Sequence, residues 1–183
     1  AKTHIKHTHE GGFTFLGWQF VHLNRNKHFY TCVRPTKKSM KQILLRVKNV
    51  IHSHRASSAY VLIEALTPVL IGWCNYHKYA QSAEIFSKVD HNVWSNLRHW
   101  VFRASRGPGR LELKEKFLPS AQQYIYHGAT HKDNWILVGE QKGKKGHTRK
   151  LYLPRADWVK IKPYTKVKGA KSPFDGDHAY WGK

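Results

Sequence analysis

The chain has 183 residues, and its 32 lysines and arginines outnumber its 11 aspartates and glutamates, which gives a net charge of +21. Such a charge repels itself unless a polyanion neutralises it, and nucleic acid is the first candidate. A hydrophobic content of 40% excludes a purely disordered basic tail. A membrane partner is disfavoured because Glu64, Thr67 and Pro68 interrupt the one long apolar run.

The two cysteines, Cys32 and Cys74, lie far apart in the sequence, and no CxxC pair is present. This pattern disfavours a secreted disulfide scaffold and a cysteine-rich zinc site, and it predicts reduced thiols. The opening residues lack the apolar core of a signal peptide and the Ser/Arg-rich character of a transit peptide. We therefore expect an intracellular location, either a bacterial cytoplasm or an organelle such as a mitochondrion or chloroplast.

Histidines are concentrated in the first ten residues. His4, His7 and His9 could ligate a metal, and His22 and His28 could complete its coordination. No regular zinc spacing is met, however, and terminal residues are usually exposed, so an edge strand with polar side chains is the favoured interpretation. We predict neither a bound metal nor a cofactor.

The next segment predicts a β-hairpin. Residues 13–20 and 28–33 are rich in aromatic and β-branched side chains, and the polar residues 24–27 between them favour a turn. We expect the aromatic side chains to cover one edge of the following helices rather than to stack on bases, since core packing is their commoner use.

A first helix is predicted from Ser39, which is a favourable N-cap, because Met40, Ile43, Leu44 and Val47 follow at helical spacing. The opposite face carries only basic charges. A solvated helix face normally mixes both signs, so we expect this face to contact phosphates.

Residues 57–80 predict a central helix that ends in a basic, aromatic segment. Pro68 should kink this helix, and Gly72 should allow close approach of another backbone. Residues 75–79 offer amide, hydroxyl, imidazole and ammonium groups, which suit RNA, although a buried helix with a polar end is the alternative. The predicted apolar stripe consists of Val61, Leu62, Ala65, Leu66, Val69, Leu70 and Trp73.

A third helix is predicted after Ser82, with Glu84 in its first turn and an apolar stripe from Ile85 to Val101. It should end before the turn at residues 107–110. Its arginines could contact RNA or could cover apolar surface with their stems. Three successive helices with short connections predict a bundle.

Beyond it, residues 111–117 predict a short helix, and residues 124–126, 135–138 and 151–153 are prone to form strands. Residues 155–160 predict a further helix or turn. The basic loop at 141–150 should be mobile until a phosphate backbone orders it. The tail at 160–183 has the composition of an RNA-wrapping arm or of a flexible linker.

The run LTPVLIGWCNYHKY at residues 66–79 resembles the maturase-specific domain, or domain X, of group II intron-encoded proteins. The similarity continues through the spacing of Phe86, Asp90, Trp94, Leu97, Trp100 and Arg103. Upstream, GGFTFLGWQF and RPTKKSM resemble the junction with a reverse-transcriptase palm, and KVKGAKSPFDGDHAYW resembles the tail that precedes an HNH nuclease module. The chain departs from the family at Thr67 and Ile71, where asparagine and arginine are usual.

No enzymatic site can be assembled from the sequence. It lacks the Tyr-Ala-Asp-Asp turn that holds magnesium in a palm, and it lacks the cysteine and histidine pairs of an HNH module. Asp175 and Asp177 lie close to His178, but a metal nuclease needs more ligands. We therefore predict a non-catalytic chain whose parent family is a reverse transcriptase.

The predicted fold is mainly α, and α+β overall. A thumb-like three-helix bundle at 37–120 follows a β-hairpin connector at 1–36 and precedes a basic, β-rich module with an extended tail at 121–183. The thumb-like character is what the family resemblance implies.

The predicted function is binding and stabilisation of folded group II intron RNA to assist splicing. One alternative is a structural RNA-binding subunit of a larger ribonucleoprotein particle, such as a ribosome, and another is a reverse transcriptase or endonuclease remnant that acts on DNA. Other proteins of such a particle, or a separate chain with a palm, are possible partners. The predicted RNA contacts are Lys37, Lys38, Lys41, Arg46, Lys48, His52, Arg55, Asn75, Tyr76, His77, Lys78, Arg98, Arg103, Arg106, Arg110, Lys144, Lys145, Arg149 and Lys150.

Overall fold

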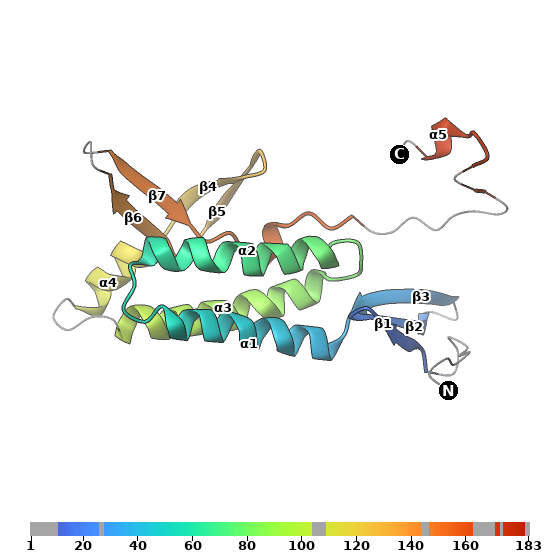
Figure 1. Ribbon diagram of the computed structural model, residues 1–183, viewed down its shortest axis with the longest axis horizontal. Coiled ribbons are helices and arrows are strands. Elements are labelled where there is room, and N and C mark those ends of the chain that lie inside the picture. The colour runs from blue at the N-terminus through green and yellow to red at the C-terminus, as the bar shows by residue number, and fades with distance from the viewer. Residues whose placement is uncertain are drawn as a thin grey trace.

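The structure is a computed structural model that describes residues 11–25, 28–103, 109–143, 147–162, 171–172 and 174–181. Three long helices lie side by side, and small antiparallel sheets flank them, so the predicted α+β class is confirmed (Figure 1). The elements are β1 (Phe13–Phe15), β2 (Trp18–Arg25), β3 (His28–Pro35), α1 (Lys37–Ser53), α2 (Ala59–His77), α3 (Ala83–Arg103), α4 (Arg110–Phe117), β4 (Gln122–Tyr126), β5 (Ala129–Asp133), β6 (Val138–Lys142), β7 (Thr148–Tyr152), the 3-10 helix η2 (Ala156–Trp158) and α5 (His178–Trp181).

The N-terminal sheet has three strands in the order β1-β2-β3, where the sequence predicted a two-stranded hairpin. Leu16 and Gly17 both adopt positive φ, at 46° and 81°, and they form a tight turn that pairs Phe15 with Trp18. Two consecutive residues at positive φ are typical of the turns that join antiparallel strands. The turn therefore divides the predicted first strand in two.

Helix α1 begins two residues before the predicted N-cap. Thr36 is the N-cap, and its side chain accepts a hydrogen bond from the backbone N–H of Ser39 at 3.0 Å. The N-cap prediction at Ser39 is therefore wrong, and the Ser39 hydroxyl is available for contacts with α2. Helix α3 does follow Ser82, but the Ser82 hydroxyl donates to the carbonyl of His77 at 2.7 Å.

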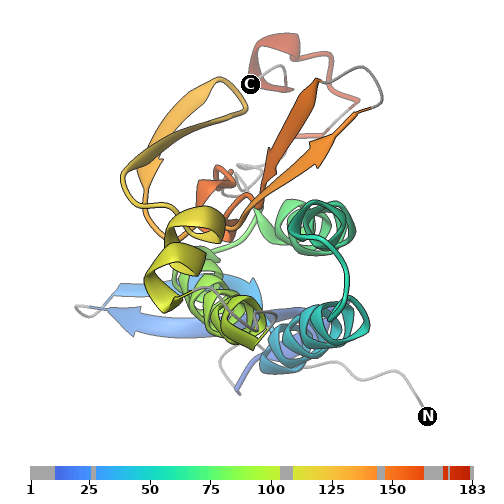
Figure 2. The same cartoon turned by 90° about the vertical axis from the view of Figure 1, so that its left-hand side faces the viewer.

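Helix α2 packs against α1 on one side and the β6–β7 hairpin on another (Figures 1 and 2). Its buried face is consequently wider than the predicted stripe and includes Ile63 and Cys74, whereas Val61 is 39% exposed. The helix continues through Pro68 as one element. Its length and composition would also suit a membrane span, but core helices commonly share these properties.

The C-terminal module consists of the β4–β5 and β6–β7 hairpins. Strand β5 was not predicted, because its sequence ATHKD is polar; the positive φ angles of His127 and Gly128 form the turn that brings it beside β4. The strand predicted at 135–138 is wrong for Ile136 and Leu137, which are buried in a connection before β6. Within the predicted mobile loop at 141–150, residues 141–142 and 148–150 are paired strand, and residues 144–146 lie outside the described residues.

A buried carboxylate joins this module to the helices. Asp90 of α3 is only 7% exposed, and it accepts the backbone N–H groups of Ala156 at 2.7 Å and Asp157 at 2.9 Å. Arg155 lies between three carboxylates: it donates to Asp133 at 2.8 Å and Asp157 at 2.9 Å, and its Nε lies 3.4 Å from Asp90. Asp90 thus caps η2 and holds it against α3.

The backbones of β6 and α2 approach each other at Gly139. A Cβ placed there would lie 2.7 Å from the carbonyl carbon of Ala59 and closer still to the nitrogen of Tyr60. The predicted close approach at Gly72 is wrong, because a Cβ at that position would meet nothing within 4 Å. Glycine is therefore required on the hairpin and not on the helix.

We expect Gly139→Ala to destabilise the fold by roughly 1–3 kcal/mol, the range found for overpacking, because the added methyl would push β6 away from the start of α2. Gly72→Ala is the matched control, and it should stabilise by roughly 0.5–1 kcal/mol through helix propensity. Thermal unfolding of both variants measures this difference. Equal melting temperatures would contradict the close approach.

Candidate nucleic-acid interface

The outer face of α1 carries positive charge without any acidic residue. Lys37 and Lys38 lie in its first turn, where the positive end of the helix dipole disfavours cations. Lys37 and Lys41 are also like charges at i, i+4, which is unfavourable in an isolated helix. The arrangement opposes helix stability, so a bound anion offers the best account of it. The exposed members are Lys37, Lys38, Lys41, Arg46, Lys48 and His52, with Arg55 just beyond the helix.

The positions on α1 divide between two flanks. Gln42 and Arg46 line a groove of about 530 Å³ toward Gly72 and Trp73 of α2. At 3.6 residues per turn, Lys41 and Lys48 fall on the opposite flank, toward α3. Lys38 lines an adjoining hollow with Gln42 and Trp73, so Lys38 and Arg46 lie on the α2 flank, apart from Lys41 and Lys48.

Helix α3 extends this basic surface. The indole N–H of Trp100 donates to the carbonyl of His54 at 3.0 Å, which holds the C-terminal ends of α1 and α3 together. His99 and Arg103 are exposed near that end. We define the α1–α3 face by the following residues: Lys37, Lys41, Lys48, His52, Arg55, His99 and Arg103.

His77 is buried, contrary to its predicted role as an RNA contact. It is 1% exposed and lies among the rings of Trp18, at 4.8 Å, and Trp73, at 4.5 Å. The Ser39 hydroxyl accepts the Trp73 indole N–H at 3.0 Å and lies 3.0 Å from His77 Nε2. Burial lowers the pKa of His77 to about 4, so the imidazole is neutral at pH 7.

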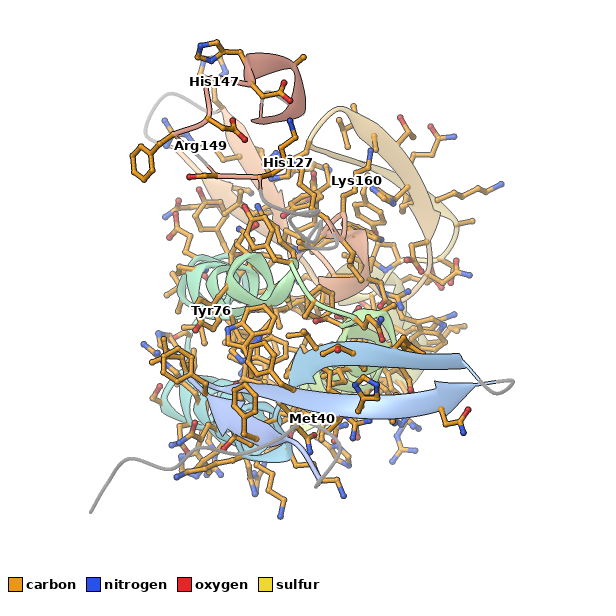
Figure 3. The ribbon with its side chains drawn as sticks, turned by 90° about the vertical axis from the view of Figure 1, so that its right-hand side faces the viewer. Met40, Tyr76, His127, His147, Arg149 and Lys160 are labelled. Carbon is orange, nitrogen blue, oxygen red and sulfur yellow. The ribbon has the colours of Figure 1, made fainter. Side chains whose placement is uncertain are left out.

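The other polar groups at the end of α2 remain at the surface. Asn75 is exposed, and its side chain accepts from Lys78 Nζ at 3.2 Å. Tyr76 is 48% exposed and lies against the β1–β2 turn, where its hydroxyl donates to the carbonyl of Leu16 at 2.8 Å (Figure 3). Lys78 is half-buried, and its Nζ lies 5.3 Å from the ring centroid of Tyr79. This end can still offer an amide and a phenol to a ligand.

The remaining predicted contacts are scattered. Arg98 lies over the ring of Trp94 at 5.7 Å, toward the C-terminal module, and Arg110 is exposed at the start of α4. Arg149 and Lys150 are exposed on β7, where Lys150 pairs with Glu140 at 2.7 Å. Figure 3 shows Arg149 with His127 and His147 on the side of the molecule away from the β1–β3 sheet. Arg106, Lys144 and Lys145 lie outside the described residues.

Residues 40–117 match the family model of the group II intron, maturase-specific domain. This segment is a group II intron maturase-specific domain. The resemblance to domain X is thereby confirmed, and the maturase-specific domain extends from the first turn of α1 to the end of α4. The resemblances drawn to a palm junction and to the tail before an HNH module stay predictions. It connects the chain with group II intron splicing. No curated protein matches the chain.

The sequence reasoning missed the structural roles of several positions in the maturase-specific domain and directly before it. Ser39 was assigned as a cap, but it holds Trp73 and His77 in place. Asp90 and Trp94 were among the residues whose spacing resembles the family. Their contacts are with the C-terminal module, which was not predicted to pack against α3. Within the described part of the chain, no group of three or more His, Cys, Asp and Glu side chains is placed to hold a metal ion.

The buried imidazole predicts a pH dependence. Because the pKa of His77 falls to about 4 in the folded state from 6.5, the unfolded chain binds more protons between these values. Stability from this group is complete above about pH 6.5 and is lost as the pH falls toward 4. The loss is on the order of 3 kcal/mol, from 1.36 kcal/mol per unit.

Urea unfolding at a series of pH values measures this loss. His77→Gln should reduce the pH dependence between pH 6.5 and 4, because it removes the titrating group. His99→Gln, which changes an exposed histidine, should keep the parent's profile. An unchanged profile in His77→Gln would show that the imidazole does not titrate with folding.

Proposed function

We propose that the chain binds folded group II intron RNA through the α1–α3 face and thereby assists splicing, while the RNA supplies the chemistry. The observation that carries this proposal is the single-sign charge of α1 within a maturase-specific domain. Lysines that oppose the helix dipole and repel one another are stabilised when phosphates neutralise them.

The mechanism is electrostatic and geometric. Folded RNA crowds phosphates together, and a rigid basic surface lowers their repulsion in one particular arrangement. The α1–α3 face supplies cations whose spacing is set by two packed helices. Asn75 and Tyr76 at the end of α2 can hydrogen-bond unpaired bases or sugar hydroxyls. Such contacts would distinguish a folded RNA from a duplex that offers only its phosphates.

Two further features belong to this proposal. The three helices would take the place of a polymerase thumb, with RNA lying across their outer surface. The exposed cations of the β6–β7 hairpin, Lys142 and Arg149, form a second basic surface that extends the contact. We infer that this binding takes place in a bacterial cytoplasm or an organelle.

RNA affinity should fall steeply with salt. If about six phosphates are neutralised, binding should weaken by about three orders of magnitude between 50 and 200 mM salt. The double variant Lys41→Gln/Lys48→Gln should reduce the slope of log K against log salt by roughly two, since each contact contributes about 0.9. Both lysines are exposed, so its melting temperature should stay close to that of the parent.

The measurement is a titration of intron RNA by fluorescence anisotropy at several salt concentrations. The matched control, Lys132→Gln/Lys160→Gln, makes the same charge change at exposed positions outside the α1–α3 face and should keep the parent's slope. A salt response that is flat in the parent would refute RNA binding through phosphates. Equal slopes in the two double variants would place the binding surface elsewhere.

A further inference from the structure

A cleft of about 530 Å³ lies between α3 and the C-terminal module. Its volume falls within the range of small-ligand sites. The apolar lining residues Leu70, Val93, Leu97, Leu137 and Leu153 come from both parts of the chain. The cleft therefore exists only because the module is held against α3.

Two tryptophans form its aromatic part. The rings of Trp94 on α3 and Trp135 in the β5–β6 connection meet edge to face, with centroids 6.2 Å apart and planes at 87°. Trp135 is 38% exposed, so a large aromatic side chain is open to solvent at the cleft. Part of the apolar surface of this ring is therefore not buried in the folded chain.

The backbone of Trp135 is strained, at φ 66°. A bulky side chain in this conformation is an outlier that usually needs compensation, and such outliers cluster at ligand sites. The surrounding connection imposes this conformation: the Asn134 side chain accepts the N–H of Ala121 at 2.6 Å, and Asp133 accepts the N–H of Asn134 at 2.9 Å. Glycine or asparagine would adopt the same backbone at lower cost.

Trp94, which lines the cleft, also carries a hydrogen-bond donor that the described part of the folded chain leaves unpaired. The indole nitrogen of Trp94 is buried and has no partner among the residues that the structure describes. Buried polar groups in folded proteins are nearly always paired, so this N–H lacks an acceptor that a ligand could supply if the Trp94 side chain turned toward the cleft. Ring nitrogens and carbonyl oxygens of nucleobases are acceptors of this kind.

Cations flank both indoles. The guanidinium of Arg98 lies 5.7 Å from the ring centroid of Trp94, and Lys114 Nζ lies 4.6 Å from that of Trp135. Arg98 is exposed on a long, flexible stem and can turn from the ring to an anion, whereas Lys114 would exchange its present partner, Glu115 at 3.2 Å, for the anion. Aromatic rings beside basic side chains are the combination that binds single-stranded nucleic acid, because bases stack while phosphates are neutralised.

We propose that this cleft binds one unpaired base of the RNA. The base packs against Trp94 and Trp135, and it accepts the Trp94 indole N–H once that side chain turns to expose its nitrogen. Arg98 and Lys114 contact the phosphates on either side of the base. This inference rests on the proposed function and adds to it. The α1–α3 face binds phosphates whatever the sequence, whereas the cleft selects an RNA with a base free to leave its stack.

The test compares two RNA hairpins that are identical except at one bulged nucleotide, which carries either a base or an abasic sugar. The full chain should bind the hairpin with the base about 5- to 150-fold more tightly, the range for one stacked base. Equal affinities for the two hairpins would overturn the cleft proposal while leaving general RNA binding intact. Failure to bind either hairpin would instead overturn the proposed function and, with it, this inference.

Trp135→Gly removes the ring and relieves the positive φ, so the variant should fold and lose the preference for the bulged base. It should keep the parent's affinity for the abasic hairpin. The control Phe174→Ala removes an aromatic side chain that is 95% exposed outside the cleft, and it should keep the preference. A folded Trp135→Gly variant that keeps the preference would overturn the proposal.

A second measurement covers the case in which Trp135→Gly fails to fold. In the parent chain, a bulged 2-aminopurine should lose fluorescence on binding, because stacking on an indole quenches it. A 2-aminopurine held inside the duplex of the same hairpin should show a smaller change. Equal changes at the two positions would show that the base does not enter the cleft.

Discussion

The contact between the Asp90 carboxylate and the backbone of η2 holds the two parts of this molecule together. Asp90 accepts two backbone N–H groups from the C-terminal module while it lies almost fully buried on α3. A buried carboxylate is costly unless it is well paired, and burial raises the pKa of Asp90 against the effect of these hydrogen bonds and of Arg155. The position of the module, and hence the Trp94–Trp135 cleft, depends on this pairing.

The charge of the chain is strongly segregated. Asp90, Asp133 and Asp157 gather around Arg155 at the junction, whereas α1 has basic residues and no acidic ones. The three acids near Arg155 pair with its guanidinium at the junction, so they do not offset the lysines on the outer face of α1. In a chain with a net charge of +21, this leaves α1 a surface of one sign that favours a polyanion.

The end of α2 shows a different use of polar residues. His77, Ser39 and Trp73 form a buried neutral network beside the N-terminal sheet. The family departures at Thr67 and Ile71 have simple structural consequences: the Thr67 hydroxyl donates to the carbonyl of Ile63 at 2.7 Å, and Ile71 packs against the apolar core. Neither position presents a charge, so the exposed cations of α1 and α3 carry most of the RNA contact that we propose.

Secondary structure was predicted correctly where the spacing of apolar residues along the chain matches the face that is buried in the folded protein. Helices α1 and α3 were found because their apolar residues recur at helical spacing and face one core. The prediction failed at Ile63 and Cys74 of α2, because a helix packed on several sides buries more than one stripe. It also failed at β5, whose polar residues pair only because a turn brings them beside β4.

The sequence by itself determined the charge, the succession of helices and the maturase-specific domain, since each depends on residue type and spacing along the chain. Only the tertiary structure decided that His77 is buried, because its neighbours Trp18 and Ser39 lie on other elements. It likewise decided that Trp94 and Trp135 share a cleft. Trp94 and Trp135 are 41 positions apart in the sequence. No local sequence pattern predicts which side chains that far apart the folded backbone brings together.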